Sequence, residues 1–184
     1  MHLRAEFAFL ALQELGPVIG FSLNLSPEIE ALARSQASPL DWLHRRVRRE
    51  LKAALGPSVP FLMAIEETDD HRRRLHLHGV LQLDLTTTRP EIITGAFRRA
   101  GGEWPKARQH QVKLTPSPDA GWISYALKDA WKTTPFMRRM LATSTLRVRF
   151  RGDVLSATAD VWRAARLSYS VGRKLIVRGG AQPW

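Results

Sequence analysis

The chain has 184 residues, 44% of them hydrophobic, which is enough for one domain with a buried core. Its 28 Lys and Arg against 17 Asp and Glu give a formal charge of +11, which favours a polyanionic partner such as nucleic acid or an acidic membrane surface, with solubility alone as the alternative. The sequence contains no cysteine, which excludes disulfides and thiolate metal sites, and it shows neither a signal-peptide pattern nor an apolar run of membrane length, so we expect a cytoplasmic protein without a membrane partner.

The first part of the chain predicts a helix, a strand, a helix and a strand in turn. Residues 3–15 are compatible with a short helix, and residues 17–26 alternate apolar and polar side chains as a half-buried strand does. The next helix begins after Ser38 as N-cap, with proline at its first position, and ends at Gly56. Residues 59–67 then alternate as a second strand.

A third strand is predicted by the stretch "RRRLHLHGVLQLD", from Arg72 to Asp84. Its leucines fall on one face, whereas Arg74, His76 and His78 fall on the opposite, polar face. Because both histidines share this polar face, the pattern favours a chemical role for them over a place in the core.

Three further elements are predicted before residue 133. Residues 91–100 form a helix that ends at two glycines, and residues 108–115 alternate as a fourth strand. Residues 119–132 form an amphipathic helix with Asp119 as N-cap. The side of this helix away from its apolar stripe carries Tyr125, Lys128 and Lys132.

The last fifty residues predict a basic extension. Residues 145–152 are compatible with a strand and residues 153–168 with a helix. The second and third strands are joined by a short loop, as in an antiparallel hairpin, so we predict an α+β fold: a central antiparallel sheet of about five strands flanked by helices. We expect residues 1–140 to form this domain, and residues 141–184 to form a basic, partly helical extension that packs on it and grips duplex DNA.

The polar residues of adjacent strands define a candidate metal site. His76 and His78 are neighbours on one side of a strand, about 7 Å apart at Cα, so both imidazoles can reach one ion. Glu66, near the end of the neighbouring strand, supplies a third ligand; Glu67 is the competing carboxylate, but alternation directs it toward the core. Two imidazoles and a carboxylate suit a first-row divalent metal or Mg²⁺ with open positions for substrate oxygen.

Tyr125 is a candidate nucleophile for phosphodiester chemistry at such a site. Attack by its phenol on a metal-bound phosphate would leave a covalent phosphotyrosine and a free hydroxyl. Lys128, one helical turn on, would place positive charge near the phenolate or the phosphate. For Tyr125 and Lys128 alone, an exposed helix surface is the simpler interpretation. The candidate metal ligands and the basic charge of the chain make a catalytic role more favourable.

Three stretches in this order resemble the HUH endonuclease superfamily, and within it the single-tyrosine rolling-circle replication initiators, or Rep proteins, of plasmids, phages and small DNA viruses. "FSLNLS" is similar to the first Rep motif, "LHLHG" to the histidine, hydrophobic, histidine motif, and "YALK" to the tyrosine, two residues, lysine motif. The resemblance covers residues 18 to 132, approximately.

The resemblance implies an HUH/Rep nuclease fold with an RRM-like palm. It implies that His76, His78 and Glu66 hold Mg²⁺ or Mn²⁺, that Tyr125 is the nucleophile and that Lys128 is the family's lysine. The implied enzyme nicks and rejoins single-stranded DNA at a specific site through a 5′-phosphotyrosine, and so initiates rolling-circle replication of a mobile element.

The implied partners are single-stranded DNA at a replication origin, adjacent duplex DNA as a further candidate, and a host helicase and polymerase. No phosphate-binding glycine loop occurs in the sequence, so unwinding would come from the host. The residues that we expect to contact nucleic acid are Asn24, Arg72, Arg73, Arg74, Gln111, Lys113 and Lys132.

Two kinds of alternative remain. Iron oxygenases and cupins also use histidines with a carboxylate. Iron oxygenases usually have a His-x-Asp or His-x-Glu motif on one strand, which is absent here. Cupins have a glutamate a few residues after the second histidine, and this glutamate is also absent. The non-enzymatic alternative is a basic sheet module that binds single-stranded nucleic acid. Such modules generally carry stacking aromatics on the exposed sheet face, and the predicted outward residues include none.

Overall fold

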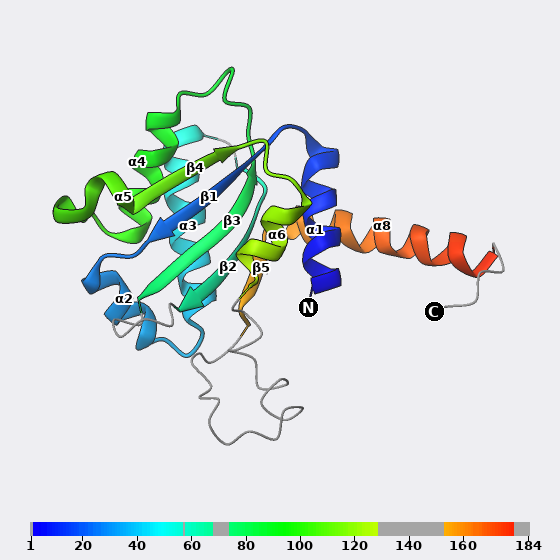
Figure 1. Ribbon diagram of the computed structural model, residues 1–184, viewed down its shortest axis with the longest axis horizontal. Helices are drawn as coiled ribbons and strands as arrows, with labels where there is room; N and C mark the ends of the chain where they lie inside the picture. Colours follow the sequence, from blue (N-terminus) through cyan, green and yellow to red (C-terminus); the bar gives the residue numbers. More distant parts are fainter. Residues whose placement is uncertain (1, 57, 68–73, 129–152, 179–184) are drawn as a thin grey trace.

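Five antiparallel strands form one sheet in the computed structural model of the chain, which describes residues 2–56, 58–67, 74–128 and 153–178 (Figure 1). The strand order is β4-β1-β3-β2-β5, and every neighbouring pair is antiparallel. The strands are β1 (Val18–Asn24), β2 (Phe61–Glu67), β3 (Leu75–Gln82), β4 (Val112–Pro116) and β5 (Leu155–Ala157). The predicted α+β class and the antiparallel sheet are therefore confirmed.

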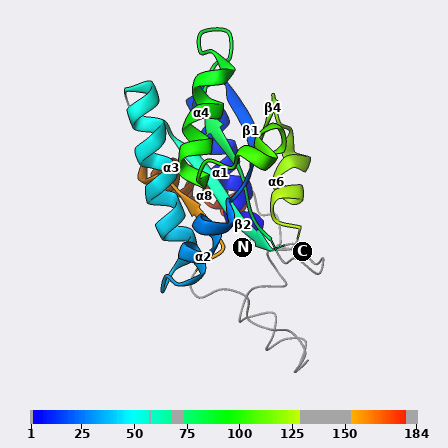
Figure 2. The ribbon, with the colours of Figure 1, turned by 90° about the vertical axis from the view of Figure 1, so that its left-hand side faces the viewer.

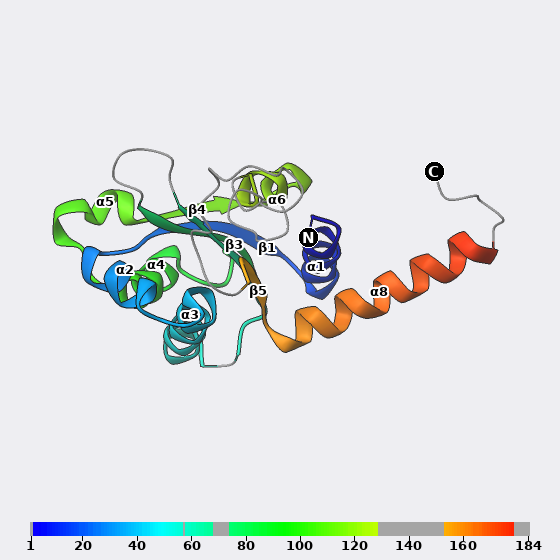
Figure 3. The same ribbon diagram turned by 90° about the horizontal axis from the view of Figure 1, so that it is seen from below.

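Helices lie on both faces of this sheet. The α-helices of the described residues are α1 (His2–Leu15), α2 (Pro27–Arg34), α3 (Pro39–Leu55), α4 (Pro90–Gly101), α5 (Arg108–Gln111), α6 (Ala120–Ala126) and α8 (Ala159–Arg178). Figures 2 and 3 show α3 and α4 on one side of the sheet and α6 on the other. Helix α8 begins beside α1 and extends away from the sheet (Figures 1 and 3). None of the described helices is both long and apolar enough to cross a membrane.

The face under α3 and α4 carries most of the apolar core. The predicted stripe of α3 is buried at Leu40, Leu43, Val47 and Leu51, and the ring of Phe21 on β1 stacks on Phe97 of α4 at 4.3 Å. Gly79, the glycine of "LHLHG", lies under that Phe21 ring. A Cβ at Gly79 would meet the carbonyl oxygen of Leu62 and approach Phe21 Cζ to 2.5 Å, so close packing of three strands requires a glycine here.

The opposite face is the one predicted to be polar, and helix α6 covers part of it. The indole N–H of Trp122 donates to the Gly79 carbonyl oxygen at 3.1 Å. The same indole lies directly over Gly20, where a Cβ would stand 2.8 Å from Trp122 Cε2. His78 lies on this predicted polar face, but it is only 4% exposed there.

Two segments differ from their predicted form. Residues 108–111 are the helix α5 rather than the start of a strand, which begins only at Val112. Residues 155–157 form strand β5, and the helix predicted over 153–168 begins at Ala159 and runs to Arg178. The strand predicted over 145–152 lies outside the described residues.

Helix α2 was not predicted, although its start has a readable signal. Ser26 accepts a hydrogen bond from the backbone N–H of Ile29 at 3.3 Å, Pro27 is the first helical residue, and Glu28 and Glu30 lie in the first turn. This combination of Ser, Pro and acidic residues is typical of a helix N-terminus.

Candidate functional site

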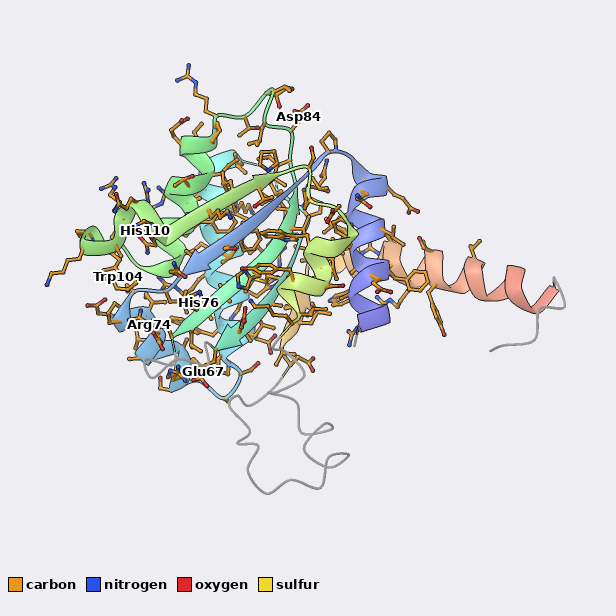
Figure 4. All side chains as sticks on the ribbon, viewed as in Figure 1. Glu67, Arg74, His76, Asp84, Trp104 and His110 are labelled. Carbon is orange, nitrogen blue, oxygen red and sulfur yellow. The ribbon has the colours of Figure 1, made fainter. Side chains whose placement is uncertain are left out.

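The central strands place the two histidines and one glutamate on the same face of the sheet. His76 of β3 pairs in register with Glu66 of β2 and with Asn24 of β1. His78 Nε2 lies 2.9 Å from Glu66 Oε2, and the two imidazole rings are 6.3 Å apart at their centroids. His76 is labelled on β3 in Figure 4, and this histidine is half-buried.

Helix α6 brings Tyr125 and Lys128 to the same point. Asp119 caps the helix as predicted, by accepting a hydrogen bond from the backbone N–H of Trp122 at 3.1 Å. Lys128, in the turn that follows α6, places its ammonium 2.9 Å from both carboxylate oxygens of Glu66. The Tyr125 ring lies 5.3 Å from the His78 ring, and Lys128 Nζ lies 4.2 Å from the centre of the Tyr125 ring. Of the predicted helix 119–132, the last four residues lie outside the described part of the chain.

The two candidate carboxylates lie on opposite faces of the sheet. Glu66 faces the histidines, whereas Glu67 lies on the α2 side, where its Oε1 is 2.7 Å from Arg34 Nη1. The pKa of Arg34 is raised, because hydrogen bonds to Glu30 and Glu67 outweigh the effect of its burial. The alternation argument that preferred Glu66 as the carboxylate beside the histidines agrees with this geometry.

Ser22 orients the buried histidine from the neighbouring strand. Ser22 and His78 are register partners on β1 and β3, and Ser22 Oγ lies 2.9 Å from His78 Nδ1. A hydroxyl both donates and accepts, so it can serve either tautomer of the imidazole. With the proton on Nε2, His78 donates to Glu66; with the proton on Nδ1, His78 donates to Ser22 and its Nε2 lone pair faces the site.

The donor types of this cluster suit a divalent cation, but in this structure its carboxylate, Glu66, holds an ammonium. Burial, followed by the nearby charge of His78, lowers the pKa of His76, so its imidazole is neutral at neutral pH, as a metal ligand must be. Among the described residues, no three His, Cys, Asp or Glu side chains are already grouped to hold a metal ion. Within the described part of the chain, the Lys128 ammonium contacts Glu66.

The predicted DNA-contacting residues have different surroundings. Lys113 is exposed on β4 and pairs in register with Ser22, so it lies on the face of the histidines. The side-chain amide of Asn24 donates to the backbone oxygen of His110 at 2.7 Å. Arg74 forms an ion pair with Glu30 at 2.7 Å. Arg72, Arg73 and Lys132 lie outside the described residues.

Gln111 is fully buried, so the prediction that it faces outward to contact nucleic acid is wrong. Its side-chain amide donates to the Gly102 carbonyl oxygen, and its side-chain oxygen accepts from the backbone N–H of Trp104 at 3.3 Å. These bonds fix the loop after α4, which presents the Trp104 ring 4.6 Å from the Arg74 guanidinium (Figure 4). The hydrogen bonds that bury Gln111 join it to Gly102 and Trp104, outside the predicted strand, so alternation along residues 108–115 could not reveal them.

Trp122 and Trp104 are the site residues that the sequence did not single out. Trp122 holds α6 on the sheet, and Trp104 lies beside Arg74, which directly precedes β3. Each ring is placed by a partner from a distant segment, and nothing in the sequence near either tryptophan identifies that partner. Comparison of the sequence with protein-family models and with curated proteins found no match.

Proposed function

We propose that this protein is a metal-dependent, site-specific single-stranded DNA endonuclease and strand transferase of the HUH type, with an RRM-like palm. In this proposal it forms a 5′-phosphotyrosine and initiates rolling-circle replication of a plasmid, phage or similar element. The observation that supports it most is the convergence of His76 and His78, Glu66, and Tyr125 with Lys128 from three separate segments. The same five residues are those that the sequence resemblance to the HUH superfamily implies for its site.

In the proposed reaction Tyr125 is the nucleophile. Its phenol oxygen attacks the phosphorus, the bond from phosphorus to the 3′ oxygen breaks, and the phenol proton ends on the released 3′-hydroxyl. Tyr125 is 46% exposed, so a DNA strand can approach its hydroxyl. Attack by a free 3′-hydroxyl on the phosphotyrosine reverses the step and joins two strands.

The neighbouring residues would hold and neutralise the phosphate. His76, His78 and Glu66 would bind Mg²⁺ or Mn²⁺, which supplies Lewis-acid polarisation of the phosphate when bound. Lys128 lies over the Tyr125 ring and would stabilise negative charge on the phenolate or the phosphate. Lys113, exposed on the same face, would contact the backbone of the single strand.

Covalent capture tests this proposal. The full chain is incubated with a diverse pool of single-stranded DNA and Mn²⁺, then denatured, and DNA attached to tyrosine is located by mass spectrometry. We expect an adduct on Tyr125 that is lost with a chelator, in Tyr125→Phe and in His76→Ala. Tyr169→Phe is the matched control, because Tyr169 is the only other tyrosine and lies on α8 against Phe7, so it should keep the adduct.

A basic module that binds single-stranded nucleic acid without cleaving it is the second candidate. The observation that favours it is that Glu66 is already neutralised by Lys128 and His78 is already hydrogen-bonded at both ring nitrogens. In that case no adduct forms on Tyr125, and His76→Ala binds single-stranded DNA as well as the wild type does.

A further inference from the structure

Glu66 is a buried carboxylate with a positively charged partner. Its two oxygens each lie 2.9 Å from Lys128 Nζ, and Oε2 also lies 2.9 Å from His78 Nε2. Only 5% of Glu66 is exposed. A carboxylate so far from water keeps its charge only when cations or donors compensate it, so the Lys128 contact stabilises the charged form.

We propose that Lys128 is the resident counter-ion of Glu66, and that a divalent metal ion binds this site by displacing the Lys128 ammonium. The inference rests on the proposed function, because it assigns the metal to the same cluster. The metal and the ammonium need the same carboxylate oxygens, and two cations at contact distance repel each other. Displacement of the ammonium would relieve this repulsion and free both oxygens of Glu66 for the metal.

The displaced ammonium has a second place beside the nucleophile. The Lys128 side chain is 43% exposed and its ammonium already lies 4.2 Å from the centre of the Tyr125 ring. Its flexible four-carbon stem lets the charge leave Glu66 and remain beside the phenol. Metal binding would thus transfer a positive charge from Glu66 to Tyr125, or to a phosphate bound there, and couple arrival of the metal to activation of the nucleophile.

A titration of the full chain with Mn²⁺ alone, without DNA, tests the displacement. Free Mn²⁺ is followed by electron paramagnetic resonance. We expect Lys128→Gln to bind Mn²⁺ about fivefold or more tightly than the wild type, since the competing and repelling charge is gone. Lys113→Gln removes the same charge from the same face without touching Glu66, and we expect it to stay within about twofold of the wild type. Lys128→Arg keeps the cation and should show no gain.

A second measurement uses the wild type and does not depend on how the variants fold. Reductive methylation labels accessible lysine ammonium groups, and mass spectrometry reports each lysine separately. We expect Mn²⁺ to increase the labelling of Lys128 and to leave that of Lys113 unchanged. Unchanged or decreased labelling of Lys128 at saturating Mn²⁺ would overturn the displacement.

The outcomes separate this inference from the proposed function. If Mn²⁺ binding is lost in Glu66→Gln and His76→Ala but is equal or weaker in Lys128→Gln, the metal site stands and the counter-ion role of Lys128 is wrong. If neither the wild type nor Lys128→Gln binds Mn²⁺, both the displacement and the metal-dependent reaction are wrong. Capture of DNA on Tyr125 is measured independently of the Mn²⁺ titration and of the lysine labelling.

Discussion

At the scale of single residues, the hydroxyl of Ser22 controls how His78 presents its ring. Ser22 Oγ is 2.9 Å from His78 Nδ1, and the imidazole itself is buried. Partners of this kind fix the orientation of a metal-binding histidine, and the Ser22 hydroxyl does so for either tautomer. The first prediction is that Ser22→Ala weakens Mn²⁺ binding by about tenfold and also lowers the melting temperature, because it leaves His78 Nδ1 without a partner.

The control for this prediction is Ser22→Thr, which keeps the hydroxyl at the same position. We expect Ser22→Thr to retain most of the Mn²⁺ affinity when free Mn²⁺ is again followed by electron paramagnetic resonance. If Ser22→Ala and Ser22→Thr lose affinity equally, the effect comes from packing around the strand and not from the hydrogen bond.

His44 gives the fold a pH dependence away from the candidate site. Its ring lies 4.6 Å from that of Phe61, and its Nδ1 is 2.9 Å from Ser156 Oγ. Burial, followed by the positive charge of Arg48, lowers the pKa of His44 below its ordinary value of 6.5. Between that lowered pKa and 6.5 the unfolded chain binds more protons than the folded chain, so stability rises with pH across this window.

The second prediction follows from this rise of stability with pH. The contribution of His44 to stability is fully present above pH 6.5 and is lost as the pH falls through the lowered pKa. Urea unfolding at pH 7.5 and 5.5 should show a lower free energy of unfolding at the acidic pH. The difference should be smaller in His44→Gln and smaller again when His76→Ala is added, since the pKa of His76 is lowered as well. An undiminished difference in His44→Gln would contradict the assignment.

At the scale of elements, alternation and helix signals in the sequence predicted the strands and helices that depend on their own local pattern of apolar residues. Strand β1 and helices α3 and α4 follow their apolar patterns closely, because each buries one regular face. Strands β2 and β3 also form, but β2 is buried along its whole length and β3 along most of it, so both of their faces are covered. Strand β5 has three residues, too few for a periodic signal, and exists through its pairing with β2. Helix α5 and the burial of His78 likewise depend on distant segments, so local pattern failed there.

The contact between Trp122 and Gly20 sets the position of α6 over the sheet. A Cβ at Gly20 would lie 2.8 Å from Trp122 Cε2, and the indole is rigid and hydrogen-bonded to Gly79. The third prediction is that Gly20→Ala costs about 1–3 kcal/mol of stability through overpacking. It should also reduce the yield of DNA captured on Tyr125, because α6 carries this residue beside His78.

Gly95→Ala is the matched control for Gly20→Ala. Gly95 lies inside α4, where an added Cβ would approach Arg99 Nη1 only to 3.4 Å, so alanine there should raise stability by a fraction of the helix-propensity difference of about 1 kcal/mol. Chemical denaturation of both variants, with capture yields measured beside it, gives the comparison. Equal stability of Gly20→Ala and the wild type would show that α6 does not depend on this contact.

At the scale of the whole molecule, the order of the strands could not be predicted from the sequence. The sheet is β4-β1-β3-β2-β5, so the first strand lies between the third and fourth, and the fifth returns to pair with the second. Of the strand pairs, only the antiparallel β2-β3 hairpin could be predicted, because a short loop joins its two strands. His76, His78, Glu66 and Tyr125 nevertheless occupy recognisable positions on their own strands or helix. Lys128 lies in the turn after α6, and its contact with Glu66 required the assembled fold.

The last prediction concerns the division of the chain near residue 140. Strand β5 is hydrogen-bonded along β2, with Ile65 N–H donating to Val154 O at 3.1 Å and Thr158 N–H donating to Phe61 O at 3.0 Å. A chain of residues 1–140 would lose this strand and α8, and would expose the edge of β2, which is buried along its whole length. We expect it to unfold at lower urea concentration than the full chain and to associate at high concentration.

A chain ending at Arg178 keeps every contact described here and should match the full chain. Equal unfolding midpoints for residues 1–140 and the full chain would instead show that the first 140 residues fold independently, and that the segment after them can be removed to test its binding to duplex DNA.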